Sequence, residues 1–206
     1  MVALHAVQNT FNSGRPERNS AASTGTLTVL LCRVEGLTQL SKLQREAMTP
    51  TLAQLNREVA EIIAARGGKY LAEQCGSDTF GATFVQASDA VATALELQRA
   101  ALAPLRLGIG IHTGELGPLC TTHTMSHAAR LRDFAHGGQT VMSRATEEAV
   151  HGRLPARAWL MNLSAQTLHR EGLGPVVQLC HRAICSDFAI ALGHHGRAVA
   201  RLRESR

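Results

Sequence analysis

Apolar runs and helically spaced apolar residues alternate along most of this chain. Short runs rich in Leu, Val and Ile predict buried strands; they cover residues 27–34, 79–85, 105–112 and 139–143, with weaker runs at 69–73, 159–163 and 176–180. Apolar residues three or four positions apart predict helices over residues 37–43, 50–63, 88–99 and 126–136. The order of these elements predicts an α+β sandwich, with helices packed over a mainly antiparallel sheet.

Turn-forming residues mark several element boundaries. Pro50 suits the first turn of a helix, and Gly67-Gly68 ends that helix. Ser88 is the predicted N-cap of the helix that follows the 79–85 strand. Gly108 and Gly110 lie inside a predicted strand, where residues without side chains allow close packing.

The composition fits one globular domain with polar ends. Of the 206 residues 45% are hydrophobic and 3% aromatic, so the core depends on Leu, Val, Ile and Ala. We expect residues 1–25 to be disordered, residues 26–182 to form the domain, and residues 183–206 to form a basic tail. No apolar run approaches the roughly 18 residues that span a membrane, and the start lacks the apolar core of a signal peptide. We therefore expect a cytoplasmic protein.

Charge and cysteine content narrow the function classes. The five cysteines are odd in number and have no framework spacing, which favours reduced thiols. The net charge is +5 and the sequence pI about 9.3, but no helix-turn-helix, zinc-finger or aromatic stacking motif accompanies it. Nucleic-acid binding is therefore disfavoured. The alternative, an electrostatic contact through the tail, would be salt-dependent and lost on deleting residues 186–206.

Six stretches, several of them with polar turns or paired glycines, indicate the family that this chain resembles. They lie at residues 28–38, 67–70, 76–84, 87–92, 106–115 and 128–139. In this order and spacing they resemble the class III nucleotidyl cyclase catalytic domain, most closely its actinobacterial form, over residues 26–180. The resemblance implies that family's ferredoxin-like βααββαβ sandwich. It also implies the family's reaction, in which the ribose 3′-hydroxyl of ATP attacks the α-phosphate.

One of the family's two metal-binding positions is altered. In the family, two aspartates on adjacent strands hold two divalent ions, Mg²⁺ or Mn²⁺, through carboxylate oxygens. Asp78 corresponds to one aspartate, and Arg33 stands in place of the other. A guanidinium is always protonated, and at 4 Å with an effective dielectric constant of 20 each unit-charge pair is worth on the order of 4 kcal/mol. The resemblance therefore indicates a degenerate member, with Arg33 either paired with Asp78 or turned to solvent.

Other family positions are partly kept. Gln74 falls at one purine-reading position, and Leu119 falls near the second, where its side chain can neither donate nor accept a hydrogen bond. Ser126 replaces the family's transition-state Asn, and Arg130 retains the transition-state Arg. An ordinary helix-surface arginine remains the alternative for Arg130.

A strand-to-helix turn supplies the predicted phosphate-binding groups. Its residues are Glu35, Gly36, Leu37 and Thr38. Free backbone N–H groups at the start of a helix attract anions whatever the side chains are. The same residues also fit an ordinary turn, so both interpretations stay open.

Two functions follow from the resemblance. The first is a cyclase homology domain impaired in two-metal cyclisation of ATP, which binds a nucleotide or a partner, or regulates cyclic nucleotide signalling, and needs no metal. The alternative is an active, low-rate adenylyl cyclase with Mg²⁺ or Mn²⁺ at Asp78 and Glu35 as a substitute ligand. Family members work as dimers, so we expect a homodimer or a heterodimer with another cyclase domain, and ATP is the candidate ligand. Residues 37–43 and 106–115 are the candidate dimer surfaces.

Two histidines raise a different possibility. His123 and His127 are four residues apart, a spacing that places two metal ligands on one helix face. Because no third ligand is near in the sequence, the favoured interpretation is a pair of partly exposed histidines.

Overall fold

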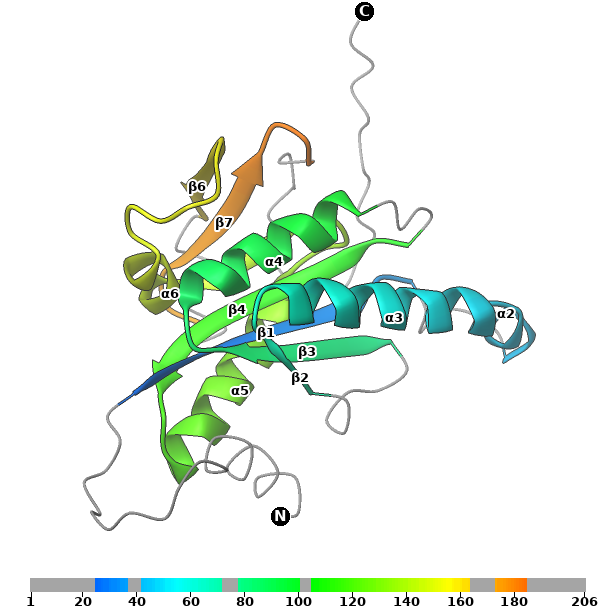
Figure 1. Ribbon diagram of the computed structural model, residues 1–206, viewed down its shortest axis with the longest axis horizontal. Helices are drawn as coiled ribbons and strands as arrows, with labels where there is room; N and C mark the ends of the chain where they lie inside the picture. The colour runs from blue at the N-terminus through cyan, green and yellow to red at the C-terminus, as the bar shows by residue number, and fades with distance from the viewer. Residues whose placement is uncertain (1–24, 37–41, 72–77, 101–104, 164–172, 185–206) are drawn as a thin grey trace, which may run out of the picture.

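The sheet has seven strands in the part of the chain that the structure describes. The computed structural model describes residues 25–36, 42–71, 78–100, 105–163 and 173–184. The strands lie in the order β2-β3-β1-β4-β5-β7-β6, and their bounds are β1 Thr26–Val34, β2 Lys69–Tyr70, β3 Thr79–Phe84, β4 Leu107–Glu115, β5 Thr140–Ser143, β6 Ala158–Asn162 and β7 Val176–His181. β4 and β5 are parallel, and the other neighbours are antiparallel. β3, β1 and β4 lie side by side in Figure 1. The predicted α+β fold with a mainly antiparallel sheet is confirmed.

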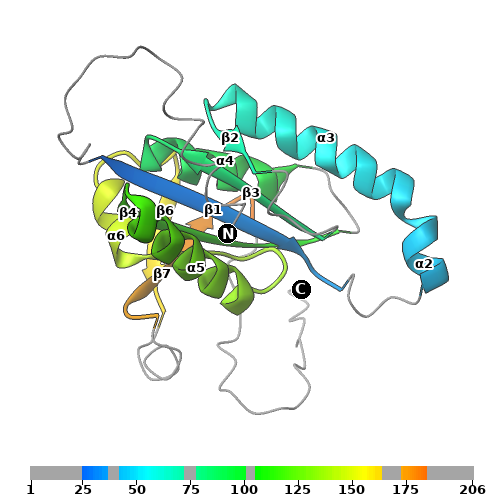
Figure 2. The ribbon, with the colours of Figure 1, turned by 90° about the horizontal axis from the view of Figure 1, so that it is seen from below.

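Helices cover both faces of this sheet. Their bounds are α2 Lys42–Ala47, α3 Thr49–Ala65, α4 Ala87–Arg99, α5 Pro118–Phe134 and α6 Arg144–Ala149. α3 and α4 lie over one face, and α5 lies over the other (Figure 2). Among the described residues, none of the helices combines the length and apolar character needed to cross a bilayer.

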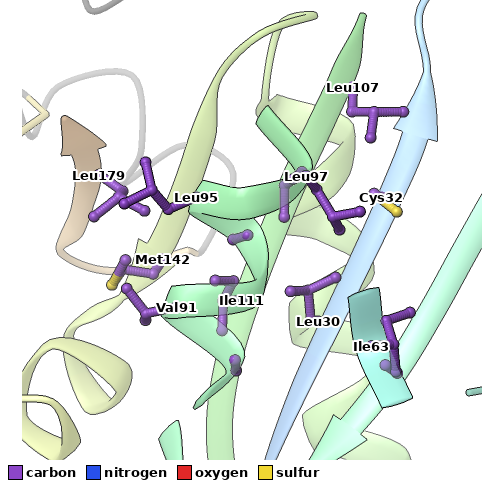
Figure 3. Close-up of a cluster of buried hydrophobic side chains, with 14 of the residues drawn as sticks. Leu30, Cys32, Ile63, Val91, Leu95, Leu97, Leu107, Ile111, Met142 and Leu179 are labelled. Carbon is purple, nitrogen blue, oxygen red and sulfur yellow. The ribbon is translucent and has the colours of Figure 1, made fainter. Parts of the chain in front are cut away.

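The face under α3 and α4 holds the largest apolar cluster. Alternate β1 residues, among them Leu30 and Cys32, point into it and are fully buried. Val91 and Leu95 of α4 and Ile111 of β4 fill the same space between sheet and helices (Figure 3). Because successive strand residues alternate between faces, this face can be filled with large side chains independently of the other.

The face under α5 is packed differently. β1 contributes its remaining apolar residues to it, namely Leu27, Val29 and Leu31. β4 presents mainly glycine there, and a Cβ built on Gly110 would stand 2.2 Å from the backbone nitrogen of Arg132 and 2.6 Å from the carbonyl oxygen of Ala128. Gly114 is equally crowded, against the side chain of Thr124. α5 therefore lies in backbone contact with β4, as the strand glycines predicted.

Two predictions about helices are wrong, and one helix was not predicted. Ser88 is not the N-cap of α4, because Gln86 occupies that position and makes no side-chain capping bond. α5 begins at Pro118, eight residues before the predicted start. The apolar pattern does not predict α6, whose N-cap Ser143 accepts a hydrogen bond from the backbone N–H of Thr146.

The candidate dimer surface at residues 106–115 is also wrong. This stretch is β4, an interior strand with helices over both faces, and Leu107 to Ile111 are buried within the chain. The strand therefore leaves little surface for a partner. Most of the other candidate surface, together with nearly all of residues 1–25 and 183–206, lies outside the described residues.

Candidate functional site

Arg33 lies near the end of β1 and points to the face that α5 covers. In the strand register it stands between Thr79 of β3 and Gly108 of β4. Its Nη1 donates a hydrogen bond to Oδ1 of Asp133 on α5 at 3.1 Å, and the two side chains are 37% and 51% exposed. Because Gly108 places no side chain between them, the guanidinium can extend across β4. Arg33 is therefore held by an ion pair rather than turned to solvent.

The predicted ion pair between Arg33 and Asp78 is wrong. Thr79, not Asp78, is the residue opposite Arg33. The carbonyl oxygen of Asp78 accepts the backbone N–H of Val34 at 2.8 Å, and Val34 belongs to the cluster under α3 and α4. Within the described residues, every ion pair of Arg33 is made to Asp133. The register and the open position at Gly108 explain this choice of partner.

Asp133 is shared by two arginines. Its Oδ1 also accepts hydrogen bonds from Nε and Nη2 of the neighbouring Arg132, at 3.0 Å and 2.9 Å. One carboxylate oxygen thus receives three N–H donors from two guanidinium groups. A cluster of two cations and one anion keeps a residual positive charge, at the position where the resemblance expects a carboxylate that binds metal.

The side chains present do not fit a two-metal centre. Mg²⁺ and Mn²⁺ prefer carboxylate oxygens, whereas Arg33 offers only donors and a fixed positive charge. Its neighbour Asp133 already accepts three hydrogen bonds from guanidinium groups. In the described ranges, no three His, Cys, Asp or Glu side chains are grouped so that they could hold a metal ion. The half-buried Asp78 is left as the single carboxylate of the expected pair.

Glu35 lies at the turn that follows β1. Its backbone N–H donates to the carbonyl oxygen of Arg106 at 2.9 Å. Its carboxylate packs against Gly137, so closely that a Cβ on that glycine would overlap it. The next residue, Gly36, has φ +84° with open space around it, which suits glycine at a tight turn. The Glu35 carboxylate is thus packed against the residues that follow α5, on the face of the sheet to which Arg33 also points.

α5 carries the two predicted catalytic positions on one exposed side. Ser126 and Arg130 are four residues apart, both are exposed, and Asp133 follows on the same side one turn later. The structure therefore brings Arg33 of β1 to the helix that carries Arg130. Other predicted site residues are not placed by it: Gln74, Leu37 and Thr38 lie outside the described residues, as does the side chain of Leu119.

A group of three histidines lies between α5 and β4. The rings of His112 and His127 are stacked, with centroids 4.2 Å apart and an interplanar angle of 18°. His123 lies 6.2 Å from His127. Nδ1 of His112 and the hydroxyl of Ser143 are hydrogen-bonded at 2.7 Å. The stack packs like an aromatic pair, and the described residues form no metal-binding group, so the metal interpretation of His123 and His127 is not supported.

Burial favours the neutral form of two of these side chains, His112 and His127. It lowers the pKa of His112 to about 4, with further lowering from the charges of His127 and His123. Burial also lowers the pKa of His127, followed by the charges of Arg130 and His123, while a backbone hydrogen bond at Leu173 raises it. Nε2 of His127 is buried and has no hydrogen-bond partner among the residues that the structure describes. Both rings are therefore neutral near pH 7. His112 was not predicted as part of the site. The available signal was its position in β4, where it shares one face of the strand with Gly108, Gly110 and Gly114.

Uncharacterized mycobacterial proteins are similar to this chain. Rv1359 of Mycobacterium tuberculosis is 47% identical over 171 residues, a match that covers 79% of this chain and 68% of Rv1359. The chain belongs to the Rv1359 family. Rv0891c of the same organism is also 47% identical over 171 residues, which cover 80% of this chain and 59% of Rv0891c. This chain thus corresponds to little more than half of Rv0891c. No model of a known protein family matches the sequence.

Solved cyclase structures share the fold of this Rv1359 family member. The adenylyl cyclase CyaB from P. aeruginosa superposes with a TM-score of 0.60 at 20% identity, covering 82% of this chain and 97% of CyaB. The guanylyl cyclase Cya2 gives 0.58 at 22% identity, covering 82% and 100%. The guanylyl cyclase domain of RhoGC from Blastocladiella emersonii, as a double mutant, gives 0.62 at 14% identity, covering 77% and 96%. At these identities the likeness shows the fold alone, and that fold is the class III nucleotidyl cyclase catalytic domain.

Proposed function

We propose that this chain is a cyclase homology domain impaired in the two-metal cyclisation of ATP, and that it serves as a nucleotide- or partner-binding module in cyclic nucleotide signalling. The observation that carries the proposal is the Arg33–Asp133 ion pair, 3.1 Å long, at the position of the expected metal carboxylate. The cyclase fold supports the class of protein. The altered side chain supports the loss of chemistry.

Electrostatics decides against ordinary metal binding at this position. A dication about 4 Å from a guanidinium faces a repulsion on the order of 4 kcal/mol for each unit of its charge, at an effective dielectric constant of 20. Each 1.4 kcal/mol is a factor of ten in an equilibrium constant. Even after solvent screening of a half-exposed side chain, metal occupancy falls by orders of magnitude. The 3′-hydroxyl of ATP therefore lacks the metal ion that would activate it for attack. The phosphates of ATP lack the ions that would neutralise their negative charge.

The remaining residues support binding better than turnover. Arg130 keeps its place on the exposed side of α5, where a guanidinium can contact a phosphate. Ser126 has a shorter side chain than the asparagine it replaces and makes a weaker contact with a transition state. In this proposal ATP is the ligand, the partner is a second copy or another cyclase domain, and the protein acts in the cytoplasm. Gln74, Leu119 and the turn at Glu35 to Thr38 are its proposed nucleotide contacts.

The proposal is tested by measuring turnover with ATP and with GTP, in Mg²⁺ and in Mn²⁺, for the wild type and Arg33→Asp. We expect little or no cyclic nucleotide from the wild type and a clear gain for Arg33→Asp, because the substitution restores the carboxylate. Arg33→Ala controls for mere removal of the positive charge and should recover less activity.

A wild type that makes cyclic nucleotide at a rate that Arg33→Asp does not raise would contradict impairment. That result would favour the low-rate adenylyl cyclase, with Asp78 and Glu35 as metal ligands. Glu35→Ala would then abolish the activity.

A further inference from the structure

The Arg33–Arg132–Asp133 cluster has more donors than acceptors. Each guanidinium carries five N–H donors, and the described residues accept only three of the ten, all through Oδ1 of Asp133. The side chains of Arg33 and Arg132 are 37% and 19% exposed. The unused donors are therefore open to a ligand from solvent.

The surrounding charges leave the cluster cationic. Glu35 and Arg106, which carry opposite charges, both lie beside Gly137. Within the described residues, the cluster itself holds two guanidinium groups and one carboxylate. The stacked His112 and His127 are neutral near pH 7 and add no charge. An anion with several oxygens is therefore bound more favourably here than a cation, because it accepts charge-assisted hydrogen bonds from the guanidinium groups.

The geometry suits an oxyanion. Arg33 comes from β1 and Arg132 from α5, and both hold the same carboxylate oxygen, so their N–H groups converge on one point in space. A phosphate offers three or more acceptor oxygens in place of that single oxygen. Planar guanidinium groups match phosphate oxygens in pairs. A phosphate bound here would compete with the Asp133 carboxylate for the N–H groups of Arg33 and Arg132.

We propose that Arg33 and Arg132 bind the triphosphate of a nucleotide without a divalent cation, the guanidinium of Arg33 taking the charge-neutralising role that metal ions have in working cyclases. The proposal rests on the nucleotide binding of the proposed function and specifies its chemistry. Because Mg²⁺ removes much of the triphosphate's negative charge, this site prefers free ATP to Mg-ATP. Asp133 competes with the ligand and weakens its binding.

Calorimetry of ATP binding in EDTA and in excess Mg²⁺ tests this site. Wild type should bind ATP in EDTA and bind it more weakly in Mg²⁺. Arg33→Asp should weaken binding in EDTA by about tenfold or more, the usual loss of a charge-assisted hydrogen bond, and Asp133→Asn should strengthen it. Arg144→Gln is the matched control, because Arg144 of α6 also contacts two carboxylates, Glu147 and Glu148, and should leave binding unchanged. Urea midpoints confirm that each variant is folded.

Three results would overturn the proposal. They are binding of ATP only when Mg²⁺ is present, equal affinity of wild type and Arg33→Asp in EDTA, and no binding of ATP or inorganic triphosphate in EDTA. The last result would leave the impairment of catalysis standing, since turnover is measured separately. Conversely, a wild type that makes cyclic nucleotide at a rate that Arg33→Asp does not raise contradicts the proposed function, whatever the calorimetry shows.

Discussion

The two faces of the sheet are built on different principles. Under α3 and α4, large apolar side chains such as Leu30, Phe84 and Ile111 interlock away from water. Under α5, β4 presents glycines and one histidine, and the charged groups Arg33 and Asp133 meet at the half-exposed edge. Both faces stabilise the fold, but the charged groups of the candidate site lie on the α5 face alone among the two. The charged residue Arg33 therefore lies on the face opposite the main core.

Gly110→Val breaks the α5 face and should have the largest effect. Its new side chain would meet backbone atoms of Ala128, Leu131 and Arg132, which no rotamer change can move. We expect a loss of about 3 kcal/mol or more in the free energy of unfolding, the upper end of overpacking costs, measured by urea denaturation.

The matched control for this variant is Ile111→Val, the next residue of β4 on the opposite face. Removal of one buried methyl group should cost about 1 kcal/mol. Similar midpoints for Gly110→Val and Ile111→Val would show that α5 can move away from β4, contrary to the packing described above.

Lowering the pH should weaken the α5 face selectively, as the second largest effect. The folded state holds the pKa of His112 at about 4, whereas an unfolded histidine has a pKa of about 6.5. Between these two pH values the unfolded chain binds a proton at His112 and the folded chain does not. The free energy of unfolding therefore falls as the pH drops from 6.5 to about 4. Above pH 6.5 the full contribution of His112 to stability is present. The depressed pKa of His127 acts in the same direction.

The measurement is a series of urea midpoints from pH 5 to pH 8 for wild type and His112→Gln. Glutamine can keep a hydrogen bond to Ser143 but does not titrate, so the variant should lose less stability on acidification. Parallel curves for the two proteins would rule out the stacked histidines as the cause.

Arg33→Ala should have the smallest effect on stability. The Arg33–Asp133 pair is half exposed, and such pairs contribute about 0–1 kcal/mol. Arg66→Ala, which breaks the exposed pair between Arg66 at the C-cap of α3 and Glu96 of α4, is the comparison and should lie within the same range. A much larger loss for Arg33→Ala would mean that the ion pair is a structural support of the α5 face.

The fold was largely predictable because the strands are short apolar runs with clear alternation. α5 was only half predicted, since it packs through Ala128 and through the strand glycines rather than through a wide stripe of large apolar residues. α6 escaped prediction because its six residues are mostly polar or small.

The candidate site shows where sequence reasoning ends. Arg33 stands out from the motif alone. Its partner Asp133 lies 100 residues away and is reached only through the register of β1 with β4, so sequence spacing pointed to Asp78 instead. His112 was missed for a related reason, since its contact with His127 depends on how closely α5 approaches β4.

Gly108 has a consequence for the charged edge. A Cβ at this position would stand 2.8 Å from the carbonyl oxygen of Ala135, which caps α5 two residues after Asp133. One added methyl group would thus lift the end of the helix and separate the carboxylate from its guanidinium partner on β1. The separation of two opposite charges is set by a residue that has neither a charge nor a side chain.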